Sequence, residues 1–318
     1  MRTSTLGNGG PEVGVVGLGC MGMTWAYDPS GRDDATSTGV IRSALDLGVT
    51  LIDTADIYGP YSNEELVGAA LAGPYRERAV LATKVGLVPG QGDERVVRNG
   101  RPEHVRRSID ESLRRLGTDH VDLYQLHRVD PEVPIEETWG ALAEAVSAGK
   151  ARRIGLSEVG VEEIKRAQAV HPVASVQSEL SLWTRDALGE VLPYTEQQGI
   201  AFLPFSPLGR GFLAGRFTSA DDLPADDFRR TMPRFQQDAL AANQAIVDAV
   251  AQIAGRLGAT SAQVALAWVL AQGRLVLPIP GTKTPKYLAD NAASAELTLD
   301  AADLAELDAL PAPTGERY

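Results

Sequence analysis

The sequence predicts an α/β protein folded as a (β/α)8 TIM barrel, with long rim loops after its third and seventh strands. Short apolar runs alternate with longer segments of helical periodicity, a pattern typical of parallel strands joined by crossover helices. About eight such units fit the 318 residues, since a barrel of this kind takes ~250 residues before insertions. No Pro/Ser-rich linker divides the chain, and we therefore expect one domain over residues 1–318.

The expected strands are apolar runs that each precede a helical segment. They cover residues 13–18, 50–53, 79–83, 121–126, 151–156, 173–176, 200–204 and 275–279. The expected helices cover residues 34–47, 63–71, 102–116, 135–148, 161–169, 187–198, 238–257, 261–271 and 285–293. Two insertions remain, at residues 86–100 and 206–237, and loops of this length in a compact domain are usually functional or disordered.

Local signals mark several helix ends. Gly48 and Gly117 follow the last apolar residue of their helices, where glycine commonly ends a helix. Pro102 lies near the first turn of the third helix, a position that tolerates proline. Ser62 and Glu65 have the spacing of a capping box, which predicts the start of the second helix.

Composition excludes several classes of function. The net charge of −12 argues against a nucleic-acid partner or an anionic membrane surface. No apolar stretch approaches the length of a membrane span, and the first ten residues lack the apolar core of a signal peptide. The single cysteine, Cys20, cannot form an intramolecular disulfide. We expect a soluble cytoplasmic protein with no metal site, whose oligomeric state stays open and for which a monomer is plausible.

Four reactive side chains each lie just past an expected strand: Asp53, Tyr58, Lys84 and His127. A parallel barrel gathers its chemistry at the C-terminal ends of its strands, so these four groups, here called the quartet, are predicted to meet on one rim. Each of them alone has an ordinary structural role, such as a helix cap, a half-buried aromatic or a surface charge. On successive strand ends, the combination favours a catalytic site.

Residues 17–22 (GLGCMG) match the G-x-G-x-x-G motif of dinucleotide-binding Rossmann domains. That motif requires its last glycine in the opening turn of a helix, whereas helical periodicity here begins only near Asp34. We therefore interpret the glycines as a closely packed strand end where backbone approaches a ligand. A two-domain Rossmann dehydrogenase is disfavoured for the same reason.

The chain resembles the aldo-keto reductases across most of its length, from Leu6 to Leu310. The matching motifs are residues 51–59 (LIDTADIYG), 83–84 (TK), 122–127 (DLYQLH), 155–157 (GLS), 177–179 (QSE) and 279–283 (IPGTK). The resemblance implies reduction of a small-molecule carbonyl by a nicotinamide cofactor, usually NADPH, with NADH as the alternative.

Hydride arriving at a carbonyl carbon leaves charge on the oxygen, so an acid must donate a proton there. We predict Tyr58 as that acid, with its pKa lowered by the Lys84 cation. Asp53 would pair with Lys84, and His127 would orient the substrate oxygen. The alternative is a nicotinamide-binding regulatory or sensor subunit of the same fold with little turnover.

The resemblance also implies a set of cofactor contacts. Ser157 and Gln177 match positions that hold the nicotinamide amide, Phe205 the aromatic that stacks on its ring, and Lys283 a contact to a 2′-phosphate. The full predicted set is Cys20, Met21, Asp53, Ser157, Gln177, Phe205, Ser206, Leu208, Gly211, Gly281, Thr282, Lys283, Asp290 and Asn291.

The chain departs from the family pattern at two positions. Glu158 stands where many members have Asn, and Tyr287 stands where some place an arginine toward the 2′-phosphate. Trp25, Tyr58 and His127 are the predicted substrate contacts, with Met21 and Tyr27 in the same apolar wall. Because the tail after Leu310 is shorter than the loop that narrows the pocket in some relatives, we expect an open pocket for bulky or varied carbonyls.

Overall fold

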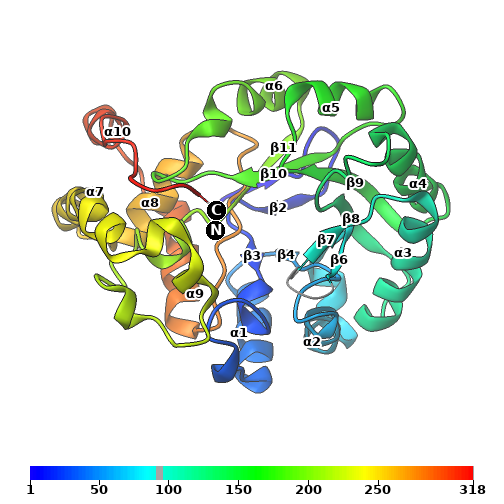
Figure 1. The fold of residues 1–318 in the computed structure, drawn as a ribbon, viewed down its shortest axis with the longest axis horizontal. Coiled ribbons are helices and arrows are strands. Elements are labelled where there is room, and N and C mark those ends of the chain that lie inside the picture. The colour runs from blue at the N-terminus through cyan, green and yellow to red at the C-terminus, as the bar shows by residue number, and fades with distance from the viewer. Residues whose placement is uncertain (91–95, 318) are drawn as a thin grey trace.

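The computed structural model describes residues 1–90 and 96–317, and its centre is a parallel sheet curved into a barrel (Figure 1). Seven strands run in the order β11-β10-β9-β8-β5-β4-β3, with parallel pairing between neighbours. They are β3 (Leu18–Gly19), β4 (Leu51–Asp53), β5 (Val80–Val85), β8 (Val121–Leu126), β9 (Ala151–Ser157), β10 (Ser175–Glu179) and β11 (Ala201–Phe205).

The segment 275–281 nearly closes the barrel between β11 and β3. It forms isolated parallel bridges, Phe202 with Val276 and Gly19 with Gly281, instead of the regular strand expected at 275–279. The first and last barrel segments pack so closely that a Cβ atom added at Gly17 would lie only 2.9 Å from Ile279 Cγ2. Gly17 and Gly19 of the G-x-G-x-x-G match therefore serve barrel closure, and a 3-10 turn (Met21–Met23) follows them in place of a Rossmann helix.

The N-terminal end of the barrel is covered by a hairpin of β1 (Thr3–Thr5) and β2 (Glu12–Gly14). The single strand expected at 13–18 is therefore divided between this hairpin and β3. Leu6 and Val13 pack inside the barrel end against side chains such as Leu51 and Leu203. Antiparallel pairing with residues 3–5 takes the first half of the apolar run out of the parallel sheet.

Helices surround the sheet, and their apolar faces pack against it (Figure 1). They are α1 (Asp34–Asp46), α2 (Ser62–Leu71), α3 (Pro102–Leu116), α4 (Ile135–Ser147), α5 (Val161–Gln168), α6 (Val191–Gln198), α7 (Gln237–Leu257), α8 (Ser261–Leu270), α9 (Pro285–Ala293) and α10 (Ala301–Asp308). These bounds confirm the expected helices to within a few residues, and α10 was not expected.

The ends of α3 and α2 differ in whether they follow the capping signals in the sequence. Gly117 ends α3 with a φ of 64°, a left-handed conformation that glycine adopts without strain. The capping box expected at the start of α2 is wrong, because the Ser62 hydroxyl donates instead to the carbonyl of Gly59, at 2.7 Å. Tyr61 takes the cap position without a side-chain hydrogen bond.

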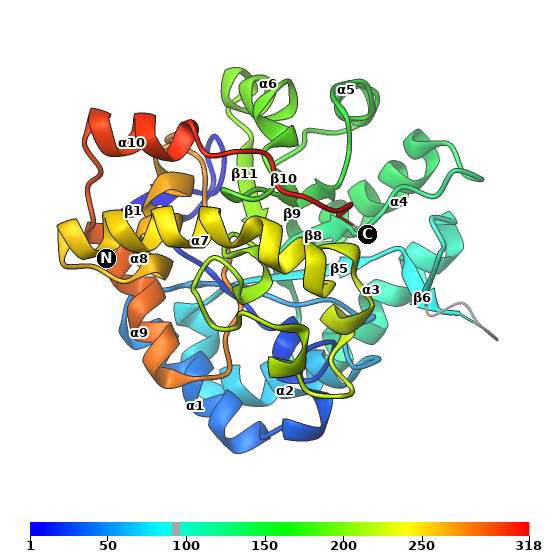
Figure 2. The same cartoon turned by 60° about the vertical axis from the view of Figure 1, so that its left-hand side comes forward.

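The two long insertions lie on the rim. The first, predicted as a loop at 86–100, contains the hairpin strands β6 (Leu87–Pro89) and β7 (Val96–Arg98), while residues 91–95 lie outside the described part. The second, 206–237, is built of short 3-10 turns. The two termini overlap in Figure 1 but lie far apart in Figure 2, where the C-terminal tail runs back toward the barrel.

Among the described residues, no single helix is both long and apolar enough to cross a membrane. The pair α7 and α8 reaches that length and composition only when joined, and the two helices are bent by 93°.

Candidate active site

A cavity of about 1040 Å³ opens at the C-terminal ends of the barrel strands. Its wall contains Asp53, Tyr58 and His127 of the quartet, and it extends past Phe205 toward the start of α9. The carboxyl ends of parallel strands share one rim, and this is why residues at the ends of β4, β8 and β11 line one cavity.

Lys84 is the centre of the quartet, although its side chain is fully buried beneath the cavity. Its Nζ donates to Asp53 Oδ1 at 2.6 Å, to the Thr54 carbonyl at 2.8 Å and to Tyr58 Oη at 3.2 Å. Burial alone would lower the pKa of Lys84, but Asp53 and Tyr58 raise it above its ordinary value. The amine is therefore a fixed cation next to the phenol oxygen.

The bonds of Lys84 also determine what the Tyr58 hydroxyl can do. An ammonium group only donates, so the phenol oxygen accepts from Lys84 and its own proton is left to donate elsewhere. Burial raises the pKa of Tyr58, and the Lys84 cation only partly offsets that rise. Lys84 thus lowers the pKa of Tyr58 as expected, but burial outweighs it, so the pKa lies above its ordinary value instead of below it.

His127 follows β8 and packs edge-on against Tyr58, with ring centroids 5.6 Å apart and planes at 82°. Burial, followed by the charges of Lys84 and Arg128, holds the pKa of His127 well below its ordinary value. The imidazole is therefore neutral near pH 7, and it can offer one N–H donor to an oxygen in the cavity.

Asp53 has two further partners that sequence reasoning did not assign. Gln177 Nε2 donates to Asp53 Oδ2 at 2.9 Å, and Gln125 Nε2 donates to the same oxygen at 3.3 Å. Gln125 lies on β8 and Gln177 on β10, and both side chains are buried. The carboxylate is held from both sides, so Lys84 is positioned by a fixed partner.

Most of the predicted cofactor residues line the same cavity. Those that do are Met21, Asp53, Ser157, Gln177, Phe205, Ser206, Leu208, Gly211, Gly281, Thr282, Lys283, Asp290 and Asn291. Cys20 does not; its side chain is fully buried, and burial raises the pKa of its thiol. The cofactor contacts themselves stay predictions.

The far end of the cavity carries cations. Lys283 Nζ pairs with Asp28 Oδ2 at 3.0 Å and also donates to the carbonyls of Asp28 and Gly31. The guanidinium of Arg216, from the loop after β11, lies 4.7 Å from the ring centroid of Tyr287. Tyr287 stands where some family members have an arginine, and here Arg216 brings a guanidinium next to that position from a different segment of the chain.

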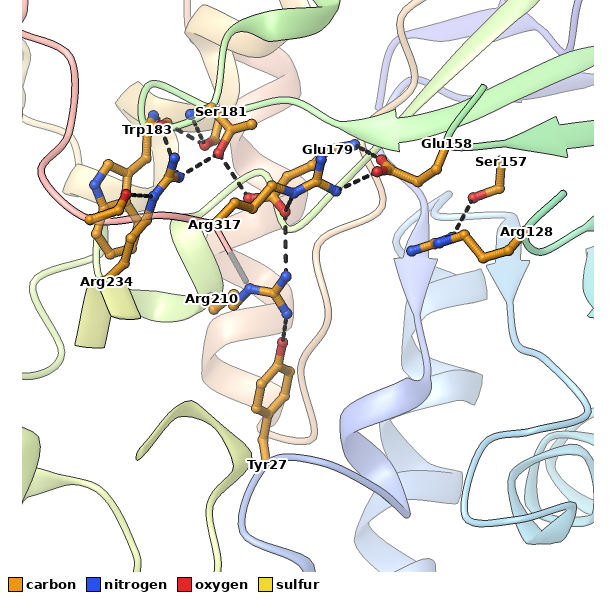
Figure 3. Close-up of polar contacts among 12 residues, drawn as sticks. Tyr27, Arg128, Ser157, Glu158, Glu179, Ser181, Trp183, Arg210, Arg234 and Arg317 are labelled. Atoms are coloured by element: carbon orange, nitrogen blue, oxygen red, sulfur yellow. Dashed lines mark hydrogen bonds and ion pairs between the residues drawn. The ribbon is translucent and has the colours of Figure 1, made fainter. Parts of the chain in front are cut away.

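The C-terminal tail reaches the rim next to the cavity, although none of residues 311–317 lines it, so the open pocket stays a prediction. Arg317 donates to Glu179 Oε2 and to Glu158 Oε2, each at 2.7 Å (Figure 3). Its guanidinium also lies 5.6 Å from the Phe205 ring centroid. Glu158, the departure from the family asparagine, is therefore engaged in an ion pair with the tail. Its φ of 54° is a left-handed conformation uncommon for this residue type.

Sequence reasoning missed several cations that line the cavity. The missed cations are Arg98, Arg128, Arg210, Arg216 and Arg229. Arg128 had a readable signal, since it directly follows His127 at a strand end. Arg98 lies on the hairpin strand β7 and the others on the long insertion 206–237, where spacing alone does not show which side chains face the cavity. Among the described residues, no group of three or more His, Cys, Asp or Glu side chains is arranged to hold a metal.

A parallel barrel that collects a phenol, an amine, a carboxylate and an imidazole on its rim defines a TIM-barrel enzyme. The aldo/keto reductase family model matches residues 15–312. A probable aldo-keto reductase of Glycine max is 45% identical over 309 residues, which cover 96% of this chain and 88% of that protein. The chain belongs to the aldo/keto reductase family and is an oxidoreductase.

Solved structures agree with this assignment. A glycerol dehydrogenase of Gluconobacter oxydans superposes with a TM-score of 0.82 at 32% identity, covering 94% of this chain and 91% of that one. An aldo/keto reductase of Klebsiella pneumoniae, solved with NADP and acetate, has a TM-score of 0.74 at 27% identity, with coverage of 100% and 98%. The prediction of a TIM barrel is confirmed.

Proposed function

We propose that this protein reduces aldehydes or ketones to alcohols with NADPH, using Tyr58 as the general acid. The observation that carries the proposal is the geometry around Lys84. Its three donors are all used, one of them on the Tyr58 oxygen, so the phenol proton remains to be delivered into the cavity.

Each member of the quartet has a distinct part in this proposal. NADPH, when bound, supplies the hydride that reaches the carbonyl carbon. Tyr58 passes its proton to the carbonyl oxygen as charge develops there, and the Lys84 cation stabilises the phenolate that remains. Neutral His127 donates a hydrogen bond to the same oxygen, and Asp53 keeps Lys84 in place.

The chain has suitable groups for the cofactor. Phe205 offers a flat apolar face at the quartet end of the cavity, and Lys283 and Arg216 offer positive charge at the other end. The NADP named in the Klebsiella pneumoniae structure supports the same choice for this chain. We propose that Lys283 leaves Asp28 to meet the 2′-phosphate, and NADH, which lacks that phosphate, would bind more weakly.

The test replaces Tyr58 by phenylalanine and measures NADPH consumption over aldehydes, ketones and sugars. We expect kcat to fall roughly 100- to 10,000-fold, the usual contribution of general acid catalysis, while NADPH still binds. Tyr124→Phe is the matched control, because Tyr124 is buried outside the cavity and its hydroxyl has no partner among the described residues.

Near-normal reduction by the Tyr58→Phe variant would show that the mechanism is wrong. If the unmodified protein binds NADPH stoichiometrically but reduces no carbonyl in the panel, the regulatory subunit becomes the better explanation.

A further inference from the structure

Two arginines line the cavity beside the quartet and are anchored to the same short piece of backbone. Arg128 directly follows His127, and its Nη1 donates to the His127 carbonyl at 2.6 Å. The same Nη1 donates to Ser157 Oγ at 3.1 Å (Figure 3). Arg98, from β7, donates through Nη1 to the carbonyl of Val129 at 3.2 Å. Both guanidinium groups are therefore held near the end of β8.

These two cations differ from others along the same cavity in having no acidic partner in the described part of the chain. Lys283 pairs with Asp28, Arg210 with Glu179 and Arg229 with Asp227. For Arg98 and Arg128, residues 1–90 and 96–317 provide only the carbonyl and hydroxyl contacts above. An uncompensated positive charge in a cleft of a protein with net charge −12 favours an anionic ligand.

Arg128 is also close enough to the reacting groups to act on the same small molecule. Its charge contributes to lowering the pKa of His127 and opposes the rise in the pKa of Tyr58. The contacts above occupy only Nη1, which leaves the Nε and Nη2 donors for a ligand. A guanidinium presents such donors in a planar fork that matches the two oxygens of a carboxylate.

We propose that Arg128, assisted by Arg98, is a specificity-determining residue that binds a carboxylate on the carbonyl substrate. The preferred substrates would then be aldehydes or ketones that carry an acid group, with the carbonyl at Tyr58 and the acid at Arg128. The apolar side chains of Trp25, Leu87 and Val96 line the cavity nearby and would cover the hydrocarbon part. The inference rests on the proposed carbonyl reduction.

The test compares matched substrates that differ only in charge. The substrates are 3-carboxybenzaldehyde, 4-carboxybenzaldehyde and succinic semialdehyde, each measured with NADPH beside its uncharged methyl ester. We expect kcat/KM for at least one acid to exceed that of its ester roughly 10- to 100-fold, the range of a charge-assisted hydrogen bond. Arg128→Gln should remove this preference by raising KM for the acid, with the ester unchanged within about twofold.

Three further variants sharpen the result. Arg128→Lys keeps the charge without the fork and should retain only part of the preference, and Arg98→Gln should have a smaller effect of the same kind. Arg114→Gln removes an equal charge from the exposed side of α3, outside the cavity, and should change nothing. NADPH affinity should be unchanged in all of these variants.

Equal rates for acids and esters in the unmodified protein would overturn the inference. So would an equal loss of kcat for both substrates in Arg128→Gln, since Arg128 would then act on Tyr58 and His127. If Arg128→Gln does not fold, the affinities of the unmodified protein for benzoate and for benzamide are compared instead. Equal affinities would overturn the inference. That binding test needs no turnover, whereas reduction of neither acids nor esters contradicts the proposed function itself.

Discussion

The floor of the cavity, formed by Lys84 and Asp53, and the loops around the rim hold charged groups in opposite ways. In the floor, Lys84 and Asp53 form an ion pair that is almost completely buried, and Asp53 Oδ2 also accepts from the neutral amides of Gln125 and Gln177. On the rim, Lys283 pairs with Asp28 while both side chains remain about a third exposed, at 27% and 37%. The floor pair is shielded from solvent, whereas the rim pair is exposed to competing anions.

This difference assigns separate tasks to the two regions. A buried pair loses much stability when one partner is removed, because an uncompensated charge is left in a poor solvent. Exposed pairs contribute little and are screened by salt. We conclude that the floor is suited to holding one fixed geometry for chemistry, and that the rim is suited to binding and releasing charged molecules.

The largest expected effect is the loss of Lys84. Lys84→Met should reduce kcat about 1,000-fold, within the range for general acid catalysis, and should lower the free energy of unfolding by about 3–5 kcal/mol because Asp53 stays buried without its cation. Steady-state kinetics and urea unfolding measure the two effects. Lys150→Met is the control, since Lys150 pairs with Asp110 on the surface.

The double variant Asp53→Asn/Lys84→Met separates stability from chemistry. It should recover much of the unfolding free energy but none of the activity. Recovery of activity would contradict the role given to Lys84.

The next effect concerns the cofactor end. Lys283→Met should raise the KM for NADPH roughly tenfold, since a charge-assisted contact to the 2′-phosphate is lost, and should leave the KM for NADH within about twofold. Lys165→Met removes an exposed cation that pairs with Glu162 on α5 and serves as the control. If both cofactors weaken equally, Lys283 does not recognise the 2′-phosphate.

A smaller effect is expected from the C-terminal tail. Arg317→Ala should lower the free energy of unfolding by about 1 kcal/mol, as for a partly exposed ion pair, because Glu179 keeps Arg210 and Thr184 as partners. Urea unfolding with and without 1 M NaCl measures it, and salt should shrink the difference. A loss of unfolding free energy that does not depend on salt would show that the Arg317 ion pairs are shielded from solvent, like the pair of Lys84 and Asp53.

The smallest effect on catalysis is expected at Asp56, a buried carboxyl behind the quartet. Burial raises its pKa well above the ordinary value, and Glu64 adds to that rise. From about pH 4, the ordinary carboxyl pKa, the unfolded chain releases a proton that the folded protein keeps, so stability falls as pH rises toward the folded pKa.

Asp56→Asn should remove this dependence, with a change of at most about 1.4 kcal/mol per pH unit. Thermal or urea unfolding between pH 5 and pH 8 (~3 units) measures it, with the exposed Asp248→Asn as control. Parallel stability curves for wild type and Asp56→Asn would contradict the buried, protonated state.

Local patterns in the sequence predict much of this protein. Periodicity, together with Gly117 and Pro102, predicts helices whose bounds the structure confirms to within a few residues. Apolar runs followed by reactive residues predict that Asp53, Tyr58 and Lys84 lie together. These predictions succeed because strand ends in a parallel barrel all face one rim, so order along the chain implies position in space.

Only the tertiary structure decides the rest, because the deciding contacts join residues far apart in the chain. Gln177 reaches Asp53 across 124 positions, Arg317 reaches Glu158 across 159, and Lys283 reaches Asp28 across 255. Closure through 275–281 likewise depends on space rather than on strand propensity. Backbone preferences are set by neighbouring residues, whereas pairing between distant side chains exists only once the barrel has brought their segments together.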